Sequence, residues 1–211
     1  GKSWNPINSN LPFSPVNVFI EDNINKEILY VGNDHGVYVS LDKGKKWEPF
    51  DNGLNSVAVH DLVIQKEMNH LLVGTHGRSI YLAELDKVQQ LNSDILNKDL
   101  YLYDINNIKR SNNWGTKWGT WGNYFLPNME IVLYSENSTK YSLSIISESG
   151  DIVHKSEGIL DKGLNYINYN LRYDDYSEES IDDNSYYLEK GSYKLIVSVN
   201  RNSISNEFEI K

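Results

Sequence analysis

One complete and one partial copy of a short pattern constrain the fold of this 211-residue chain more than any other feature. Residues 40–47 read S-L-D-K-G-K-K-W, and the sequence opens with G-K-S-W, the last four positions of the same S-x-D-x-G-x-x-W pattern. In such a pattern the aspartate accepts backbone N–H groups, the glycine supplies a positive φ, and the tryptophan plugs the base of a β-hairpin. The pattern therefore predicts a stapled hairpin turn built on Ser40, Asp42, Gly44 and Trp47.

The two copies lie 43 residues apart, a period that is typical of β-propeller blades and other stacked arrays. Turn signals divide the first ninety residues into two similar units. The first has predicted strands at 16–21, 27–32, 36–40 and 46–50, and the second has strands at 57–65, 70–75 and 79–84, followed by short helices at 85–91 and 93–97. Residues 1–90 are thus predicted to be the terminal blades of a propeller. Because a ring needs about four to eight blades, further blades are expected outside this sequence; the alternative is a small open sandwich.

Composition excludes several classes of partner. The net charge is −9, and only four of the twenty basic residues are arginine, which argues against nucleic acid. The chain has no cysteine and therefore no disulfide or thiol chemistry. No run approaches the roughly 18 apolar residues of a membrane span. We expect no cofactor.

From residue 126 onward, apolar and polar residues alternate over runs of five to eight positions. Strands are predicted at 129–134, 141–146, 151–155, 166–171, 192–199 and 204–210. These strands predict an antiparallel β-sandwich over residues 126–211. Residues 91–125 are predicted to form a helical exit and a linker rich in tryptophan and glycine.

Several motifs resemble one family in the same order along the chain. Residues 40–47 match the Asp-box, or bacterial neuraminidase repeat (BNR), and L-L-V-G-T-H-G-R-S-I-Y at 71–81 looks like the last-blade signature of bacterial sortilin-type propeller proteins. Their C-terminal domain carries D-x-x-G-x-x-V, G-x-N-x-x-x-W-D-x-R and P-G-x-Y elements. The counterparts here are S-E-S-G-D-I-V at 147–153, G-L-N-Y-I-N-Y-N-L-R at 163–172 and K-G-S-Y at 190–193. They depart from the family at Ser147, at Tyr169 with Asn170, and at Lys190.

The resemblance implies an all-β protein: a partial Asp-box propeller followed by an Ig-like or fibronectin-III-like β-sandwich, similar to that of flagellar hook-capping proteins. It implies a non-catalytic scaffold that binds protein or glycan and is secreted, periplasmic or on a bacterial cell surface. The remaining blades, in the same precursor or a companion chain, would be its partners.

The family's glycosyl hydrolase label raises an alternative, a sialidase-like enzyme with catalytic residues in N-terminal blades outside this sequence. A sialidase site needs three arginines, a tyrosine nucleophile with a glutamate, and an acidic proton donor. Of Arg78, Arg110, Arg172 and Arg201, only Arg78 lies in the predicted blades. No catalytic residue is therefore assigned.

Two groups are candidate binding residues. His35, His60, His76 and Arg78 lie in or beside matching turns, where they could form a polar-ligand site or act as buried hydrogen-bonded braces. No two histidines have ligand spacing on one element, so no metal site is predicted. Trp114, Trp118 and Trp121 alternate with glycines and could form a platform for a sugar ring, or could pin the linker against a domain.

Overall fold

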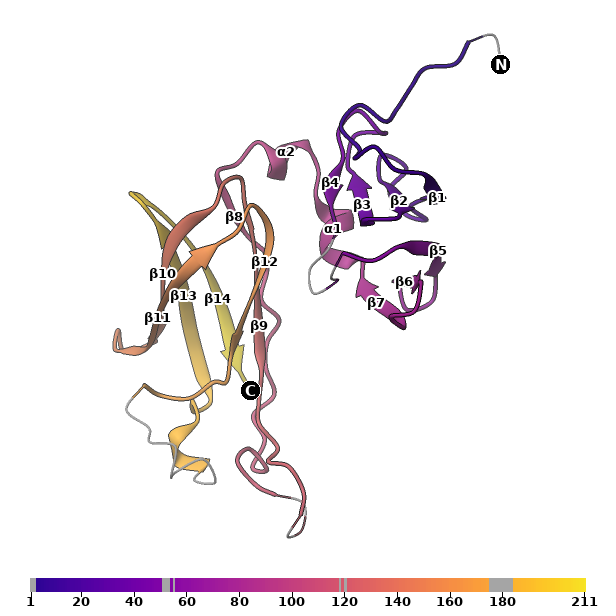
Figure 1. The fold of residues 1–211 in the computed structure, drawn as a ribbon. Coiled ribbons are helices and arrows are strands. Elements are labelled where there is room, and N and C mark those ends of the chain that lie inside the picture. The colour runs from indigo at the N-terminus through magenta and orange to yellow at the C-terminus, as the bar shows by residue number, and fades with distance from the viewer. Residues whose placement is uncertain (1–2, 51–53, 55, 118, 120, 175–183) are drawn as a thin grey trace. The chain divides into compact units, whose positions relative to one another are not determined.

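The computed structural model describes residues 3–50, 54, 56–117, 119, 121–174 and 184–211, which form several antiparallel β-sheets (Figure 1). The predicted all-β class is confirmed, and none of the sheets described closes on itself. The chain divides into two compact units, Gly1–Ser93 (unit 1) and Asp94–Lys211 (unit 2).

Unit 1 contains two sheets in which each strand pairs with the next one along the chain. The first is β1 (Val16–Glu21), β2 (Leu29–Asn33), β3 (Gly36–Ser40) and β4 (Glu48–Pro49), and the second is β5 (Val59–Gln65), β6 (His70–Thr75) and β7 (Ile80–Glu84). All seven predicted strands are present, although β4 has only two residues where five were expected. Within the described residues no fourth strand joins the second sheet.

Two short helices, α1 (Asp86–Gln90) and α2 (Ser93–Leu96), follow β7 as predicted. Leu85, Val88 and Leu91 are buried, so the apolar side of α1 is covered. No helix in the described part of the chain is both long and apolar enough to cross a membrane.

The turn between β3 and β4 has the local geometry that its sequence predicts. Gly44 has a φ of 84°, and its N–H donates to Ser40 Oγ at 2.7 Å. Ser40 Oγ donates to Asp42 Oδ1 at 2.8 Å, and the same oxygen of Asp42 accepts the N–H of Lys46 at 2.9 Å. The Trp47 ring is buried at the base of the hairpin. All of these hydrogen bonds join residues of the turn to one another, so they stabilise its conformation.

The N-terminal segment is hydrogen-bonded to the end of this turn. The side-chain amide of Asn10 donates to Trp47 O at 2.7 Å and accepts the Trp47 N–H at 2.8 Å, as a neighbouring strand would. Trp47 Nε1 also donates to Ile7 O at 2.6 Å. Residues 3–8 contain no strand, and Trp4 is exposed.

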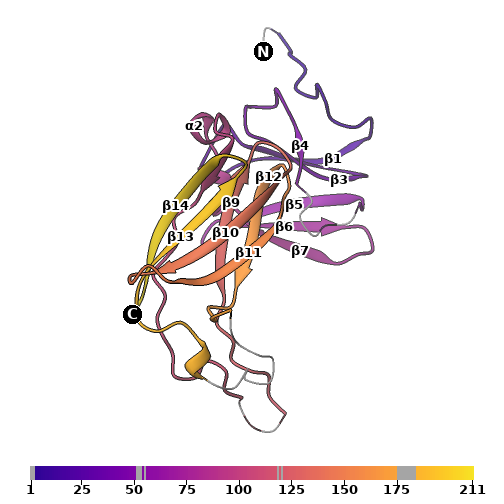
Figure 2. The same cartoon turned by 90° about the vertical axis from the view of Figure 1, so that its left-hand side faces the viewer.

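Unit 2 contains seven strands in two antiparallel sheets. The strands are β8 (Leu100–Leu102), β9 (Met129–Ser135), β10 (Thr139–Ser147), β11 (Ile152–Leu160), β12 (Gly163–Tyr169), β13 (Gly191–Val199) and β14 (Asn202–Ile210). One sheet has the order β11-β10-β13-β14, whose four strands lie side by side in Figure 2, and the other has the order β12-β9-β8. The six predicted strands are all present, with β11 and β12 displaced or extended by several residues.

Both sheets of unit 2 contribute to one hydrophobic core. Its buried residues come from alternating strand positions, among them Met129, Ile131, Leu133, Leu143, Ile145, Leu195, Val197, Phe208 and Ile210. The structure differs from the prediction that residues 91–125 form a linker. Residues 100–102 form β8, which pairs with β9, and Trp114 lies within the same core. The segment therefore belongs largely to unit 2.

Candidate functional site

The bulges and turns at one end of unit 1 bring two of the predicted histidines, His60 and His76, together. The first strand of each sheet carries a β-bulge near its start, where the register shifts at Asn17 on β1 and at His60 on β5. A bulge turns an extra side chain away from the regular alternation of the strand. These two residues are 43 apart, the same period as the opening pattern.

Each bulged residue lies against the turn between the second and third strands of a sheet. In the first sheet Asn17 Nδ2 donates to Asp34 Oδ1 at 2.9 Å and also to Val59 O, at the start of β5, at 3.1 Å. In the second sheet the rings of His60 and His76 have their centroids 5.3 Å apart at an interplanar angle of 43°. The two sheets thus repeat one arrangement, and we call this region the turn end of unit 1.

Hydrogen bonds within the two turns fix these positions. Asn33 Oδ1 accepts the N–H groups of His35 at 2.8 Å and of Gly36 at 3.1 Å. In the other turn, Thr75 Oγ1 donates to Ser79 O at 2.6 Å. Ser79 has a φ of 84°, a conformation that is uncommon for a residue with a side chain and that clusters at functional sites.

All four predicted polar residues at this end are exposed. His35, His60, His76 and Arg78 are open to solvent, so the interpretation of the histidines as buried braces is wrong. The bond from Asn17 to Asp34 takes the bracing role instead. Exposed imidazoles can donate and accept hydrogen bonds, whereas a guanidinium only donates them, and both groups can stack on a ligand. Within the described residues, no group of three or more His, Cys, Asp or Glu side chains could hold a metal ion.

The tryptophans do not form one platform. Trp114 is 3% exposed, with Arg110 Cζ 4.6 Å from its ring centroid and the Tyr187 ring 5.8 Å away. Its predicted role in ligand binding is therefore wrong, because neither ring face is open to a sugar. Trp121 is 98% exposed, and Trp118 lies outside the described residues. The alternative, a ring pinning its segment against a domain, fits Trp114.

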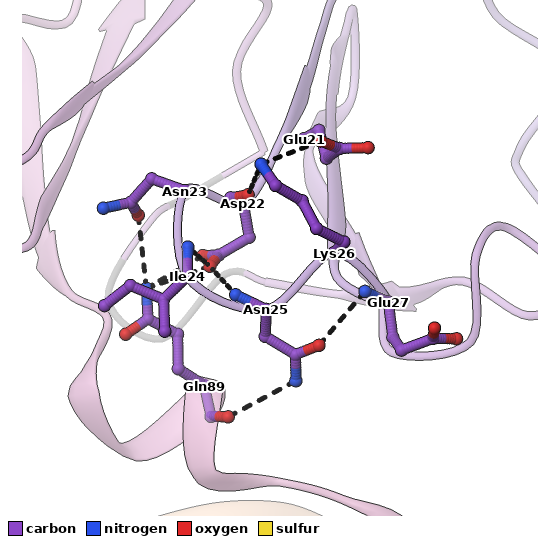
Figure 3. A network of polar contacts seen from close by, with 8 residues as sticks. All are labelled: Glu21, Asp22, Asn23, Ile24, Asn25, Lys26, Glu27 and Gln89. Carbon is purple, nitrogen blue, oxygen red and sulfur yellow. Dashed lines mark hydrogen bonds and ion pairs between the residues drawn. The ribbon is translucent and has the colours of Figure 1, made fainter.

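A second polar cluster, shown in Figure 3, surrounds the β1–β2 turn. The carboxylate of Asp22 is fully buried and accepts the N–H groups of Ile24 and Asn25, both at 2.8 Å. It also accepts Tyr30 Oη at 3.1 Å and Gln89 Nε2, on α1, at 2.9 Å. Burial, with Asp22 beside it, raises the pKa of Tyr30 above its ordinary value. This cluster ties α1 to the first sheet and is structural.

Sequence reasoning misses Asn17, although a signal for it exists. Asn17 occupies the position of His60 one period earlier, so the repeat alone pairs them. The contact between Asn17 and Asp34 can be inferred only when the bulge is known, because in a regular strand the side chain of Asn17 would point in another direction.

Comparisons with known proteins assign no family. No known protein-family model matches the sequence, and no curated protein matches it. Among solved structures, the extracellular domain of a protein described as a one-component system from B. thetaiotaomicron is similar, with 12% identity and a TM-score of 0.26. The match covers 93% of this chain and 25% of that one. This chain therefore spans about a quarter of the length of that protein.

Proposed function

We propose that this chain is the non-catalytic binding portion of a secreted, periplasmic or cell-surface bacterial protein, and that its ligand is a protein or a glycan. The observation that carries the proposal is the repeated bulge and turn at the turn end of unit 1. Two sheets there present exposed polar side chains from equivalent positions, and hydrogen-bonded turns hold their backbone in place. A pre-organised surface of this kind loses little entropy on binding.

Unit 1 supports the sortilin-like, Asp-box propeller reading in two ways. Its two sheets of consecutive hairpins repeat with the period of the opening pattern, as adjacent blades do. The second sheet also leaves apolar side chains exposed on β7, namely Ile80 at 69% and Leu82 at 57%. Further blades, from the same precursor or a companion chain, would cover such a surface.

Unit 2 supports an Ig-like module beside the propeller. Seven strands divided four and three over one core are the arrangement of many Ig-like sandwiches. Tyr193, near the start of β13, donates from its hydroxyl to Glu189 O at 2.9 Å. A tyrosine that bonds the backbone a few residues upstream is the tyrosine corner of that fold.

The positions of the arginines favour binding over sialidase chemistry. Of the four arginines, only Arg78 lies in unit 1. Arg172 is buried in unit 2, and the Arg110 side chain is also largely covered there. The three-arginine carboxylate clamp of a sialidase therefore does not form within the described residues of unit 1.

The test combines a glycan array with an activity screen of the full chain on fluorogenic glycosides and sialosides. We expect binding without turnover, and we expect His60→Ala, His76→Ala and Arg78→Ala each to weaken the binding by roughly tenfold, as for a lost hydrogen bond. Glu67→Ala, in the exposed turn between β5 and β6, is the matched control and should bind as the parent does.

The array also separates the two ligand classes. A silent array, together with a specific protein cross-link from a photoreactive residue at position 78, would support a protein ligand. Turnover of any glycoside, or binding that is insensitive to all three turn-end substitutions, would contradict the proposal.

A further inference from the structure

Four basic side chains line one pocket in unit 2, although the whole chain carries a net charge of −9. The pocket has a volume of about 350 Å³ and is lined by Asn107, Ile108, Lys109, Arg110, Lys190 and Lys211. None of these residues is acidic. The lining of the pocket is therefore positively charged, although the chain as a whole is negatively charged, and it favours an anionic ligand.

The backbone brings these residues together from three places in the sequence. Ile108 pairs in parallel with Ile210 at the end of β14. Arg110 N donates to Lys211 O, and Lys211 N donates to Ile108 O, both at 2.8 Å. On the other side of β14, Gly191 pairs with Ile210, which places Lys190 at the same end of the sheet. The cluster is thus held by paired backbone.

Arg110 contributes a buried charge whose close neighbours are neutral, including the Trp114 ring, whose centroid lies 4.6 Å from Arg110 Cζ. Its side chain is 6% exposed, and its acceptors are neutral: Ser111 O at 3.1 Å, Asn184 O at 3.0 Å and Asn184 Oδ1 at 2.6 Å. The nearest carboxylate in the described structure, that of Glu189, is 4.0 Å away and largely exposed. Within the described residues, its Nε has no hydrogen-bond partner. Buried charges are normally paired, so this cation favours an anion nearby.

The lysines around Arg110 are only partly neutralised. Lys211 Nζ lies 3.1 Å from Glu209 Oε2, which satisfies one of them. In the described part of the chain, neither Lys109 nor Lys190 has a carboxylate within ion-pair distance, and both are exposed. Two exposed ammonium groups and one buried guanidinium suit a ligand with several negatively charged oxygens.

We propose that this pocket binds a phosphate or sulfate group, either as the free ion or as an ester on a sugar. Its volume lies at the lower end of the range of small-molecule sites, which accommodates a group of that size with a sugar ring. The proposal concerns unit 2 and is independent of ligand binding at the turn end of unit 1.

The test titrates the full chain with inorganic phosphate, inorganic sulfate, glucose 6-phosphate and glucose 6-sulfate by isothermal calorimetry, with glucose as a neutral control. We expect saturable binding of the anions that weakens as ionic strength rises, and no binding of glucose. Lys109→Ala and Lys190→Ala should each raise Kd by roughly tenfold. Tighter binding of the esters would identify a sugar-borne group, and equal or tighter binding of the inorganic ions would identify the free ion.

The control variant is Lys140→Ala, which removes one exposed lysine from β10. In this sheet β10 is separated from β14 by β13. It should leave Kd within about twofold of the parent, as for an exposed charge without a close partner. Thermal unfolding of each variant checks that the fold is intact. No saturable binding of any of the four anions, or equal losses in Lys140→Ala and Lys190→Ala, would overturn the proposal.

Discussion

Gly32, on β2, lies close to Val59, at the start of β5 in the other sheet of unit 1. A Cβ atom at this position would lie 2.6 Å from Cγ1 of Val59, on β5, and 2.7 Å from Cγ1 of Val18, on β1. Gly74 is the equivalent residue of the second sheet, in L-L-V-G against L-Y-V-G. There a Cβ atom would lie 3.5 Å from the Cβ of Asp61, an ordinary contact.

Gly32→Ala should therefore lower the free energy of unfolding by about 1–3 kcal/mol, because two β-branched side chains must move to admit one methyl group. Urea denaturation, followed by tryptophan fluorescence, measures the change in midpoint. Gly74→Ala is the matched control and should change stability by less than about 1 kcal/mol, with either sign. Equal losses in the two variants would show that the close approach is not the cause.

At the scale of single residues, the sequence is informative where the chemistry is local. The roles of Ser40, Asp42, Gly44 and Trp47 were predictable because their hydrogen bonds lie within eight residues. The hydrogen bonds between Asn10 and Trp47 were not predictable, since the two residues are 37 positions apart and an isolated asparagine carries no pattern. The exposure of the histidines likewise depends on bulges and turns that the alternation of apolar residues does not reveal.

Among the elements, β7 is the exposed edge of the second sheet in the described structure. It pairs with β6 on one side only, and Ile80 and Leu82 are exposed on it. Edge strands with apolar side chains tend to pair with other chains. The sequence predicted this strand and its missing neighbour, because the second unit repeats only three of the four strands of the first.

We therefore expect the isolated chain to associate with itself as its concentration rises, and Leu82→Lys to suppress that association by placing a charge on the edge. Light scattering coupled to size-exclusion chromatography reports the mass across a concentration series. Met68→Lys makes the same change at an exposed methionine in the turn between β5 and β6 and should leave the association intact. A monomeric parent at every concentration would contradict this prediction.

The element that the sequence did not predict is β8. It has only three residues, Leu100–Leu102, and lies between a short helix and a segment rich in asparagine. Three residues are too few to show alternation, so only pairing with β9, about thirty positions later, identifies the strand. For the same reason most of the segment predicted as a linker, residues 91–125, lies in unit 2, since it carries this strand and a core tryptophan.

At the scale of the whole molecule, five tyrosines among the described residues have a pKa above the ordinary value of 10.0: Tyr30, Tyr103, Tyr141, Tyr169 and Tyr193. Burial is the largest cause for each, because it disfavours the phenolate. The hydroxyl of Tyr169, for example, donates to Arg172 O inside unit 2. Both units contain such residues, so the effect belongs to the chain as a whole.

Stability should therefore fall as the pH rises above about 10. Above that value the unfolded chain releases tyrosine protons that the folded chain retains. The contribution of these tyrosines to the free energy of unfolding is therefore fully present below about pH 10 and is lost as the pH rises. Urea denaturation between about pH 8 and about pH 11 measures the slope. Tyr169→Phe removes one of these groups and should make the slope shallower. A stability that is constant over this range would contradict the assignment.

The pairing of residues 108–110 with the end of β14 also bears on how fast the chain can fold. Asn206 Nδ2 donates to Tyr103 O, and Glu209 N donates to Asn107 Oδ1, across more than 100 residues of sequence. Unit 1, by contrast, builds its sheets from consecutive hairpins. Pairing residues that are distant in sequence first costs the entropy of closing a long loop, and the stabilising contacts form only afterwards. Such pairings therefore form slowly. Unit 1 should gain hydrogen-exchange protection first during refolding, while completion of the basic pocket in unit 2 waits until the last strand has been captured.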